Sequence, residues 1–376
     1  ILEFLDMGSE GNPIQNLQYG VTVTDQWLEE MKTGDADKHK VWAKVIQRRN
    51  EFGFPYIMFK DNSNNNSPYK ELGLDITASN LCSEIQLPTD SFNSFVCCLG
   101  SINLLHWDEI KETDAIETYT LFLNAVMDEF VLKSYNMPGM KRAWRFANDH
   151  RALGLGVLGY HSLFQSKLIT FDSLQAKQLN HEIFSTMKEK SEEASRWLHD
   201  EKGYKSIRPG YANTTLIAIA PTKSSSFILG QVSMGIEPIK SNYFIKDLAK
   251  SKTIYKNPFL IEELEKYGLN TPEVWEGILK RDGSVQHLDF PTKEVFKSFV
   301  EISPKEIVLQ AAQRQHFIDQ SQSLNLMIHP SVPAKDINQL YLYAHEEGVK
   351  TLYYQFSQSS AQSFARDILE CSSCEG

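Results

Sequence analysis

The chain has 376 residues, of which 41% are hydrophobic and 23% charged, and its formal net charge at pH 7 is −10. This length suffices for roughly two or three domains or for part of one large barrel, and the composition is typical of a globular protein. The negative charge argues against nucleic-acid binding as the main role. No run of about 18 apolar residues occurs, so we expect no membrane-spanning helix.

The first third of the chain alternates helical and extended patterns. Apolar periodicity predicts helices over 21–32 and 39–52, and a short strand over 56–59. The turn-forming run DNSNNNSP at 61–68 predicts a loop. We expect an extended segment at 80–84 and a buried strand over 95–105, broken near Gly100.

The remainder continues this alternation. Helices are predicted over 114–132, with Asp114 and Glu117 as a capping pair, and over 173–200, ended by Gly203. A strand at 214–220 precedes a short helix, and a capping box at Ser303 opens a helix that reaches about residue 319. The last elements predicted are a strand at 324–328, a helix at 335–347 and a strand at 349–355. Strands that alternate with helices indicate an α/β fold with a parallel sheet or barrel.

The stretch 80–84 carries a thiol between an amide and a carboxylate. In an extended segment Asn80, Cys82 and Glu84 point to the same face. Such an edge could meet the hydroxyls and a C–H bond of a ribose. A buried structural cysteine with polar neighbours is the plainer interpretation of this motif by itself, because free cysteines are usually buried.

Two further motifs are candidates for phosphate binding. Residues 154–159 match G-x-G-x-x-G, but the preceding stretch is polar and helix-like rather than a strand, so we interpret these glycines as close-packing positions. Thr222, Lys223, Ser224 and Ser225 follow a strand and open a helix, which directs N–H groups, hydroxyls and one positive charge to a single point. An ordinary helix N-cap explains that turn equally well.

The last candidates are aromatic or thiol pairs. Tyr353 and Tyr354 lie in a predicted strand, where they could pass a hydrogen atom stepwise or simply pack. Cys371 and Cys374 form a C-x-x-C pair near the end of the chain, which suits thiol exchange better than a metal site, so we expect no metal on this chain. The chain has five cysteines, an odd number and few for its length, which favours a reducing cytoplasm over a secreted disulfide framework.

Together, these motifs resemble the large, catalytic subunit of class I ribonucleotide reductase. The resemblance covers essentially the whole chain and rests on motifs in the family's order: NLCSEI at 80–85, VCCLGSINL at 96–104, ANTTLIAIAPT at 212–222, GIEP at 235–238, FIDQSQSLN at 317–325 and TLYYQ at 351–355. It implies an α/β fold that is part of a ten-stranded barrel, over residues 1–355, with a finger loop near 80–85. A flexible redox tail would occupy 356–376.

The resemblance also implies roles for the candidate residues. Cys82 would become a thiyl radical, Glu84 would act as general base on the 3′ hydroxyl, and Asn80 would bind the ribose. Cys97 would be one of two reducing cysteines, with Cys98 as inert packing. The substrate diphosphate would be bound by Thr222, Lys223, Ser224 and Ser225. Tyr354, facing outward, and Tyr353, facing the barrel, would relay the radical. Cys371 and Cys374 would re-reduce the active-site disulfide.

The second reducing cysteine of the family has no counterpart before Cys82, and the chain begins at Ile1 without a methionine. We therefore expect a piece of a larger enzyme that cannot turn over alone. Its expected partners are an N-terminal large-subunit chain, a small subunit bearing a metal–tyrosyl radical cofactor, thioredoxin or glutaredoxin, and a ribonucleoside diphosphate. ATP and deoxynucleotide effectors would bind upstream. A dithiol oxidoreductase that uses Cys371 and Cys374, or a non-catalytic assembly chain, remain alternatives.

Overall fold

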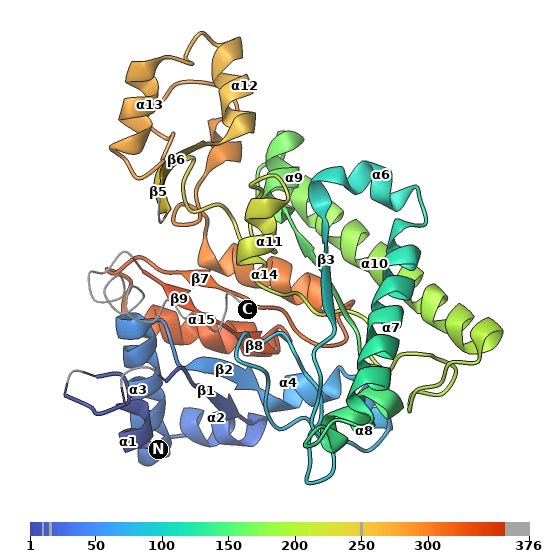
Figure 1. Cartoon of the computed structure of the whole chain (residues 1–376). Coiled ribbons are helices and arrows are strands. Elements are labelled where there is room, and N and C mark those ends of the chain that lie inside the picture. Colours follow the sequence, from blue (N-terminus) through green and yellow to red (C-terminus); the bar gives the residue numbers. More distant parts are fainter. Residues whose placement is uncertain (10, 15–16, 249–250, 358–376) are drawn as a thin grey trace.

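The computed structural model describes residues 1–9, 11–14, 17–248 and 251–357 (Figure 1). The helices of this part are α1 (Leu2–Leu5), α2 (Asp25–Lys32), α3 (Ala36–Phe52), α4 (Lys60–Asn65), α5 (Pro68–Glu71), α6 (Trp107–Lys111), α7 (Ala115–Ser134), α8 (Lys141–His150), α9 (Tyr160–Ser166), α10 (Leu174–Lys202), α11 (Lys223–Ile228), α12 (Pro258–Lys266), α13 (Pro272–Leu279), α14 (Pro304–Gln315) and α15 (Ala334–Glu346). Its strands are β1 (Gly20–Val23), β2 (Tyr56–Phe59), β3 (Leu99–Asn103), β4 (Gly154–Leu158), β5 (Tyr243–Leu248), β6 (Ser251–Lys256), β7 (Leu326–Met327), β8 (Thr351–Leu352) and β9 (Gln355–Phe356).

Apart from the β5–β6 hairpin, the extended segments lie together in one array that carries the site. β1 pairs in parallel with β2, and β2 pairs antiparallel with β8. β3 pairs in parallel with β4, and β7 with β9. The segment 214–220 links these groups, because Ile217 bridges to β4 and Ile219 bridges to Gln322, four residues before β7. Strands from the beginning, middle and end of the chain are therefore neighbours.

Helices cover this array, and one small unit projects from it. The pairs α7–α10, α10–α14 and α14–α15 pack against one another (Figure 1). The principal core contains apolar side chains from both ends of the chain. The β5–β6 hairpin, α12 and α13 form the projecting unit, which has its own core around Trp275 and Phe296 (Figure 1). None of the described helices combines the length and apolarity needed to cross a bilayer.

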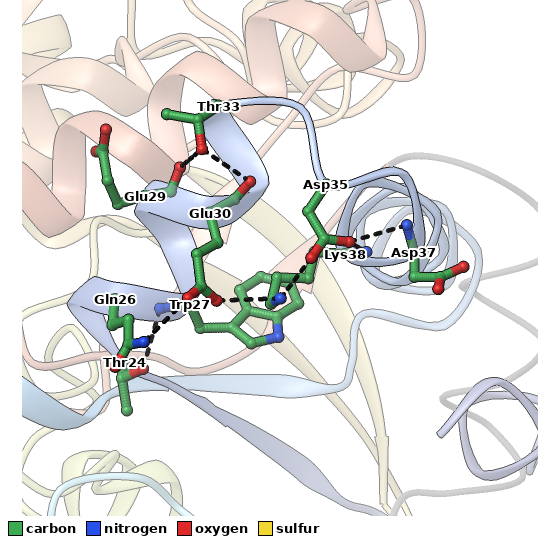
Figure 2. Close-up of polar contacts among 9 residues, drawn as sticks. All are labelled: Thr24, Gln26, Trp27, Glu29, Glu30, Thr33, Asp35, Asp37 and Lys38. Carbon is green, nitrogen blue, oxygen red and sulfur yellow. Dashed lines mark hydrogen bonds and ion pairs between the residues drawn. The ribbon is translucent and has the colours of Figure 1, made fainter.

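Polar side chains fix the junction between α2 and α3, as Figure 2 shows. The hydroxyl of Thr24 accepts a hydrogen bond from the backbone N–H of Trp27 at 3.1 Å and so caps α2. Asp35 accepts from the backbone N–H groups of Asp37 and Lys38 and caps α3. The ammonium group of Lys38 reaches Asp35 at 2.6 Å and Glu30 at 3.0 Å, which ties the two helices together.

Two predicted elements near the start of the chain are wrong in part. The predicted helix at 21–32 is a helix only from Asp25, because the β-branched run before Thr24 pairs with β2 as strand β1. The predicted loop at 61–68 contains α4 and the start of α5. Its asparagines satisfy distant carbonyls instead of forming turns: Asn62 donates to His345 O and Val349 O at 2.8 and 2.9 Å.

Predicted helix caps and one predicted strand also differ. Helices α7 and α14 begin close to their predicted starts, but neither Asp114 nor Ser303 makes a side-chain capping bond. The strand predicted at 95–105 begins only at Leu99, runs through Gly100 and is only partly buried. The long helix α10 does match its prediction, with Ser173 as N-cap and Gly203 as a left-handed C-cap.

The glycines of 154–159 pack closely, as predicted. A Cβ at Gly154 would lie 2.5 Å from Leu99 Cδ2, and one at Gly156 would lie 2.7 Å from Ala218 O. Helix α8, rather than a strand, precedes them. These residues let β4 approach both neighbouring strands and do not form a dinucleotide turn.

Candidate functional site

The segment around Cys82 is a tight turn, so the prediction of an extended run at 80–84 is wrong. The backbone N–H of Ser83 donates to Asn80 O at 3.1 Å, and Ser83 has a positive φ of 69°. The side-chain oxygen of Asn80 accepts from Ile85 N at 3.0 Å and closes the turn. The alternation of faces expected for an extended strand therefore does not apply to Asn80, Cys82 and Glu84.

Two other segments hold this turn in place. The backbone N–H of Ser321 donates to Glu84 O at 2.9 Å, and the Thr351 hydroxyl donates to Ser83 O at 3.0 Å. The Ser323 hydroxyl lies 2.6 Å from Cys82 O and 3.1 Å from the Glu84 carboxylate. The last three residues of the turn are thus anchored to the central array.

Glu84 is a buried carboxyl group, with a side chain that is 2% exposed. Burial raises its pKa above the ordinary value, while hydrogen bonds from its own backbone N–H, Asn80 and Ser323 act in the opposite direction. A carboxylate held in such surroundings has an increased affinity for a proton. This is the property that a general base requires near neutral pH.

The described thiols lie in different surroundings. Cys82 is half-buried and packs against the principal core. Cys97 has an exposed side chain, but desolvation by the surrounding protein, followed by the negative charge of Glu84, raises the pKa of its thiol to about 11. Cys98 is buried and donates to Leu123 O at 3.5 Å, as expected of a packing residue. Cys371 and Cys374 lie outside the described residues.

Three phenol rings gather beside the turn. Tyr353 and Tyr354 have ring centroids 4.5 Å apart. The ring of Tyr56, on β2, lies 4.7 Å from the first and 5.1 Å from the second. Tyr353 is buried and Tyr354 is half-buried. Burial, the two neighbouring phenols and Cys82 all raise the pKa of Tyr56, so this phenol stays protonated and the thiol lies within its electrostatic reach.

The candidate phosphate turn follows the segment 214–220, which forms only isolated bridges rather than the predicted strand and runs beside Ser323. The N–H of Ser323 donates to Ile219 O at 2.9 Å, and the turn begins three residues after Ile219. Thr222 has a positive φ of 55°, and its hydroxyl accepts from Gly235 N at 2.8 Å. The three residues that follow are exposed at the start of α11: Lys223, Ser224 and Ser225.

Tyr56 and Ser323 are site residues that the sequence interpretation did not include. Tyr56 was assigned only to a short strand, and its ring reaches the tyrosine pair because β2 and β8 are neighbours. Ser323 lies inside the motif FIDQSQSLN, but no spacing rule connects it to a turn about 240 residues earlier. The position of Ser323 within a resemblance motif was the one signal that could have drawn attention to it.

Comparison with known proteins identifies relatives over nearly the whole chain. The family model described as "Ribonucleotide reductase, barrel domain" matches residues 28–208 and 205–355. The putative ribonucleoside-diphosphate reductase large subunit of Frog virus 3 is 32% identical over 411 residues, which cover 100% of this chain and 73% of that protein. The large subunit of Invertebrate iridescent virus 3 is 37% identical over 327 residues, covering 84% of this chain and 51% of that protein.

A solved structure is also similar. The class Id ribonucleotide reductase alpha subunit of Actinobacillus ureae aligns with a TM-score of 0.90 and 53% sequence identity. The alignment covers 98% of this chain and 69% of the alpha subunit. The chain therefore spans between about half and three quarters of the length of these relatives.

Proposed function

The chain belongs to the ribonucleotide reductase large-subunit family, and we propose that it supplies the radical-bearing part of an active site that reduces ribonucleoside diphosphates. The family match and the structural likeness confirm the predicted reductase-barrel fold. The observation that carries the proposal is the meeting of one thiol, one buried carboxyl and a phenol cluster. Cys82 lies on a turn with Glu84 and packs against the core that contains the rings of Tyr56 and Tyr353.

In this proposal the turn performs the first chemical step. A thiyl radical on Cys82 removes the 3′ hydrogen atom of the ribose, which forms an S–H bond and leaves a carbon radical. Glu84 accepts the proton of the 3′ hydroxyl, for which its burial is suited. Asn80 braces the turn through the N–H of Ile85, and its amide N–H₂ group, which also donates to the Glu84 carboxylate, binds the ribose.

Reduction at the 2′ carbon then requires hydrogen and electrons from thiols. Cys97 is one source, and a cysteine outside this chain is the other. Loss of the 2′ hydroxyl as water leaves these two thiols as a disulfide, and Cys82 returns its hydrogen atom to C3′ and becomes a thiyl radical again. Cys371 and Cys374 then reduce the disulfide before thioredoxin or glutaredoxin reduces them in turn. The high pKa of Cys97 keeps its hydrogen on sulfur until it is needed.

Substrate and radical would reach the turn from different directions. The exposed groups of Lys223, Ser224 and Ser225 hold the diphosphate at the start of α11. Tyr354 and then Tyr353 pass the radical inward from a small subunit that carries the metal–tyrosyl cofactor. Nucleotide effectors bind an N-terminal part of the large subunit, and the assembled enzyme works in the cytoplasm.

The test is reconstitution. The chain is assayed for reduction of a ribonucleoside diphosphate with the small subunit and a thiol reductant, with and without an N-terminal large-subunit chain. Product should form only when all components are present. Full activity without the N-terminal chain would contradict the division of the site, and no activity in the complete mixture would contradict the function itself.

A further inference from the structure

The Ser323 hydroxyl occupies the point where the backbone of Cys82 meets the side chain of Glu84. Ser323 is buried, with 5% of its surface exposed, and its own N–H is bonded to Ile219 O at 2.9 Å. The backbone that carries the hydroxyl is therefore fixed in the array. From that position the oxygen lies 2.6 Å from Cys82 O and 3.1 Å from Glu84 Oε2.

A serine hydroxyl has one proton to donate, yet both neighbours are acceptors when Glu84 is ionised. The proton can then be donated fully to the Cys82 carbonyl or to the carboxylate, but not to both. When Glu84 is protonated the conflict disappears. The acid can donate to the Ser323 oxygen while Ser323 donates to Cys82 O, which forms one directed chain of hydrogen bonds.

We propose that Ser323 is a positioning residue that couples the proton on Glu84 to the placement of the Cys82 turn. While Glu84 is ionised, its carboxylate competes for the serine proton that otherwise binds the Cys82 carbonyl. Once Glu84 has taken the substrate proton, the Ser323 hydroxyl donates its proton to the Cys82 carbonyl without competition from the carboxylate. This inference rests on the proposed function, because it assigns a consequence to proton uptake by Glu84 during the reaction.

The surroundings of Glu84 support this role. The thiol of Cys97 lies close enough to Glu84 for the carboxylate charge to raise its pKa, and Cys82 lies on the same turn as Glu84. Asn80 and Ser323 provide side-chain hydrogen bonds that lower the pKa of Glu84, against the larger effect of burial. Removal of the serine hydroxyl should therefore move the pKa of Glu84 further upward.

The activity test uses the assembled reductase with wild type, Ser323→Ala and Ser323→Thr. Loss of one hydrogen bond to a charged group should lower kcat about 10- to 100-fold in Ser323→Ala. The acid limb of the kcat/KM profile should move to higher pH, because the base must be ionised to act. Ser323→Thr keeps the hydroxyl and should restore most of kcat and the wild-type profile.

A matched control distinguishes an effect specific to Ser323 from the general effect of removing a buried serine hydroxyl. Ser191 is another fully buried serine, on α10, whose hydroxyl donates to a backbone carbonyl, Lys188 O, at 3.1 Å. Ser191→Ala should leave the pH profile unchanged. If the wild-type assembly is active and Ser323→Ala has the same kcat and the same pH profile, the inference is overturned while the proposed function stands.

A second readout does not depend on turnover. Difference infrared titration of the whole chain, with Glu84→Gln used to assign the signal, reports the protonated carboxyl stretch of Glu84. That stretch should titrate at higher pH in Ser323→Ala than in wild type, and its frequency should rise as its hydrogen bond is lost. Identical titrations would refute the coupling even if the assembly proved inactive.

Discussion

Tyr56 provides a direct test of how the phenol cluster works. Its ring contacts both Tyr353 and Tyr354, and its hydroxyl donates to the amide oxygen of Gln18 at 3.0 Å. The same hydroxyl is also hydrogen-bonded with Tyr354. Neither an amide oxygen nor a phenol is a strong proton acceptor, so we expect Tyr56 to support the relay through its ring rather than through its O–H group. Tyr56→Phe keeps the ring contacts and removes the hydroxyl, at a cost of about 0.5–1.5 kcal/mol in the free energy of unfolding for each hydrogen bond lost.

Tyr56→Leu removes the ring as well. The two ring contacts contribute about 0.5–1.5 kcal/mol each, and the loss of volume brings the expected destabilisation to about 2–4 kcal/mol. Substrate reduction by the assembled enzyme should fall at least about tenfold in this variant, because Tyr353 loses the neighbouring ring that holds its orientation. It should stay within about fivefold of wild type in Tyr56→Phe, since a change in the activation barrier of up to roughly 1 kcal/mol gives no larger factor.

The measurements are urea denaturation of the chain and substrate reduction in the assembled enzyme. Tyr160→Phe is the matched control, because Tyr160 is fully buried and its hydroxyl lies 2.8 and 2.7 Å from the amide oxygens of Asn180 and Gln310 on other helices. If Tyr56→Phe abolished activity while Tyr160→Phe did not, Tyr56 would itself carry the radical and the reasoning would be refuted.

Three further predictions concern the general base Glu84 and two buried positions in the strand array. Activity should fall as pH drops through the raised pKa of Glu84, and Glu84→Gln should lose about 100-fold or more in kcat, measured by a pH–rate series. Gly156→Ala should destabilise the chain by about 1–3 kcal/mol in urea denaturation, because the added Cβ meets Ala218 O, whereas Gly277→Ala, in α13, should cost nothing. Lys350→Met should cost about 3 kcal/mol or more, because the buried ammonium group donates to three carbonyls; an unchanged denaturation midpoint would contradict this.

Sequence patterns predicted the elements whose causes are local. The helix α10 has its own cap at each end, and β2 is a continuous apolar run, so neighbouring residues suffice to specify them. Glycines 154 and 156 were also interpretable, because the helix-like stretch before them excludes a dinucleotide turn. The α/β class followed from the alternation of such elements.

The geometry of the site depends on contacts that sequence spacing cannot encode. The turn at Cys82 is set by Asn80, by the positive φ of Ser83 and by bonds to residues about 240–270 positions later in the chain. A motif of the form N-x-C-x-E does not reveal whether its backbone is extended or turned. The position of Tyr56 follows likewise from the pairing of β2 with β8, which joins segments from opposite ends of the chain.

The central claim is that the sulfur of Cys82 performs the chemistry. The most direct measurement is deoxyribonucleoside diphosphate formation by the complete assembly containing either wild type or Cys82→Ser, with folding of both checked by circular dichroism. The account predicts product from wild type and none from Cys82→Ser, since a serine O–H does not yield the radical under these conditions. Equal product from both proteins would contradict it.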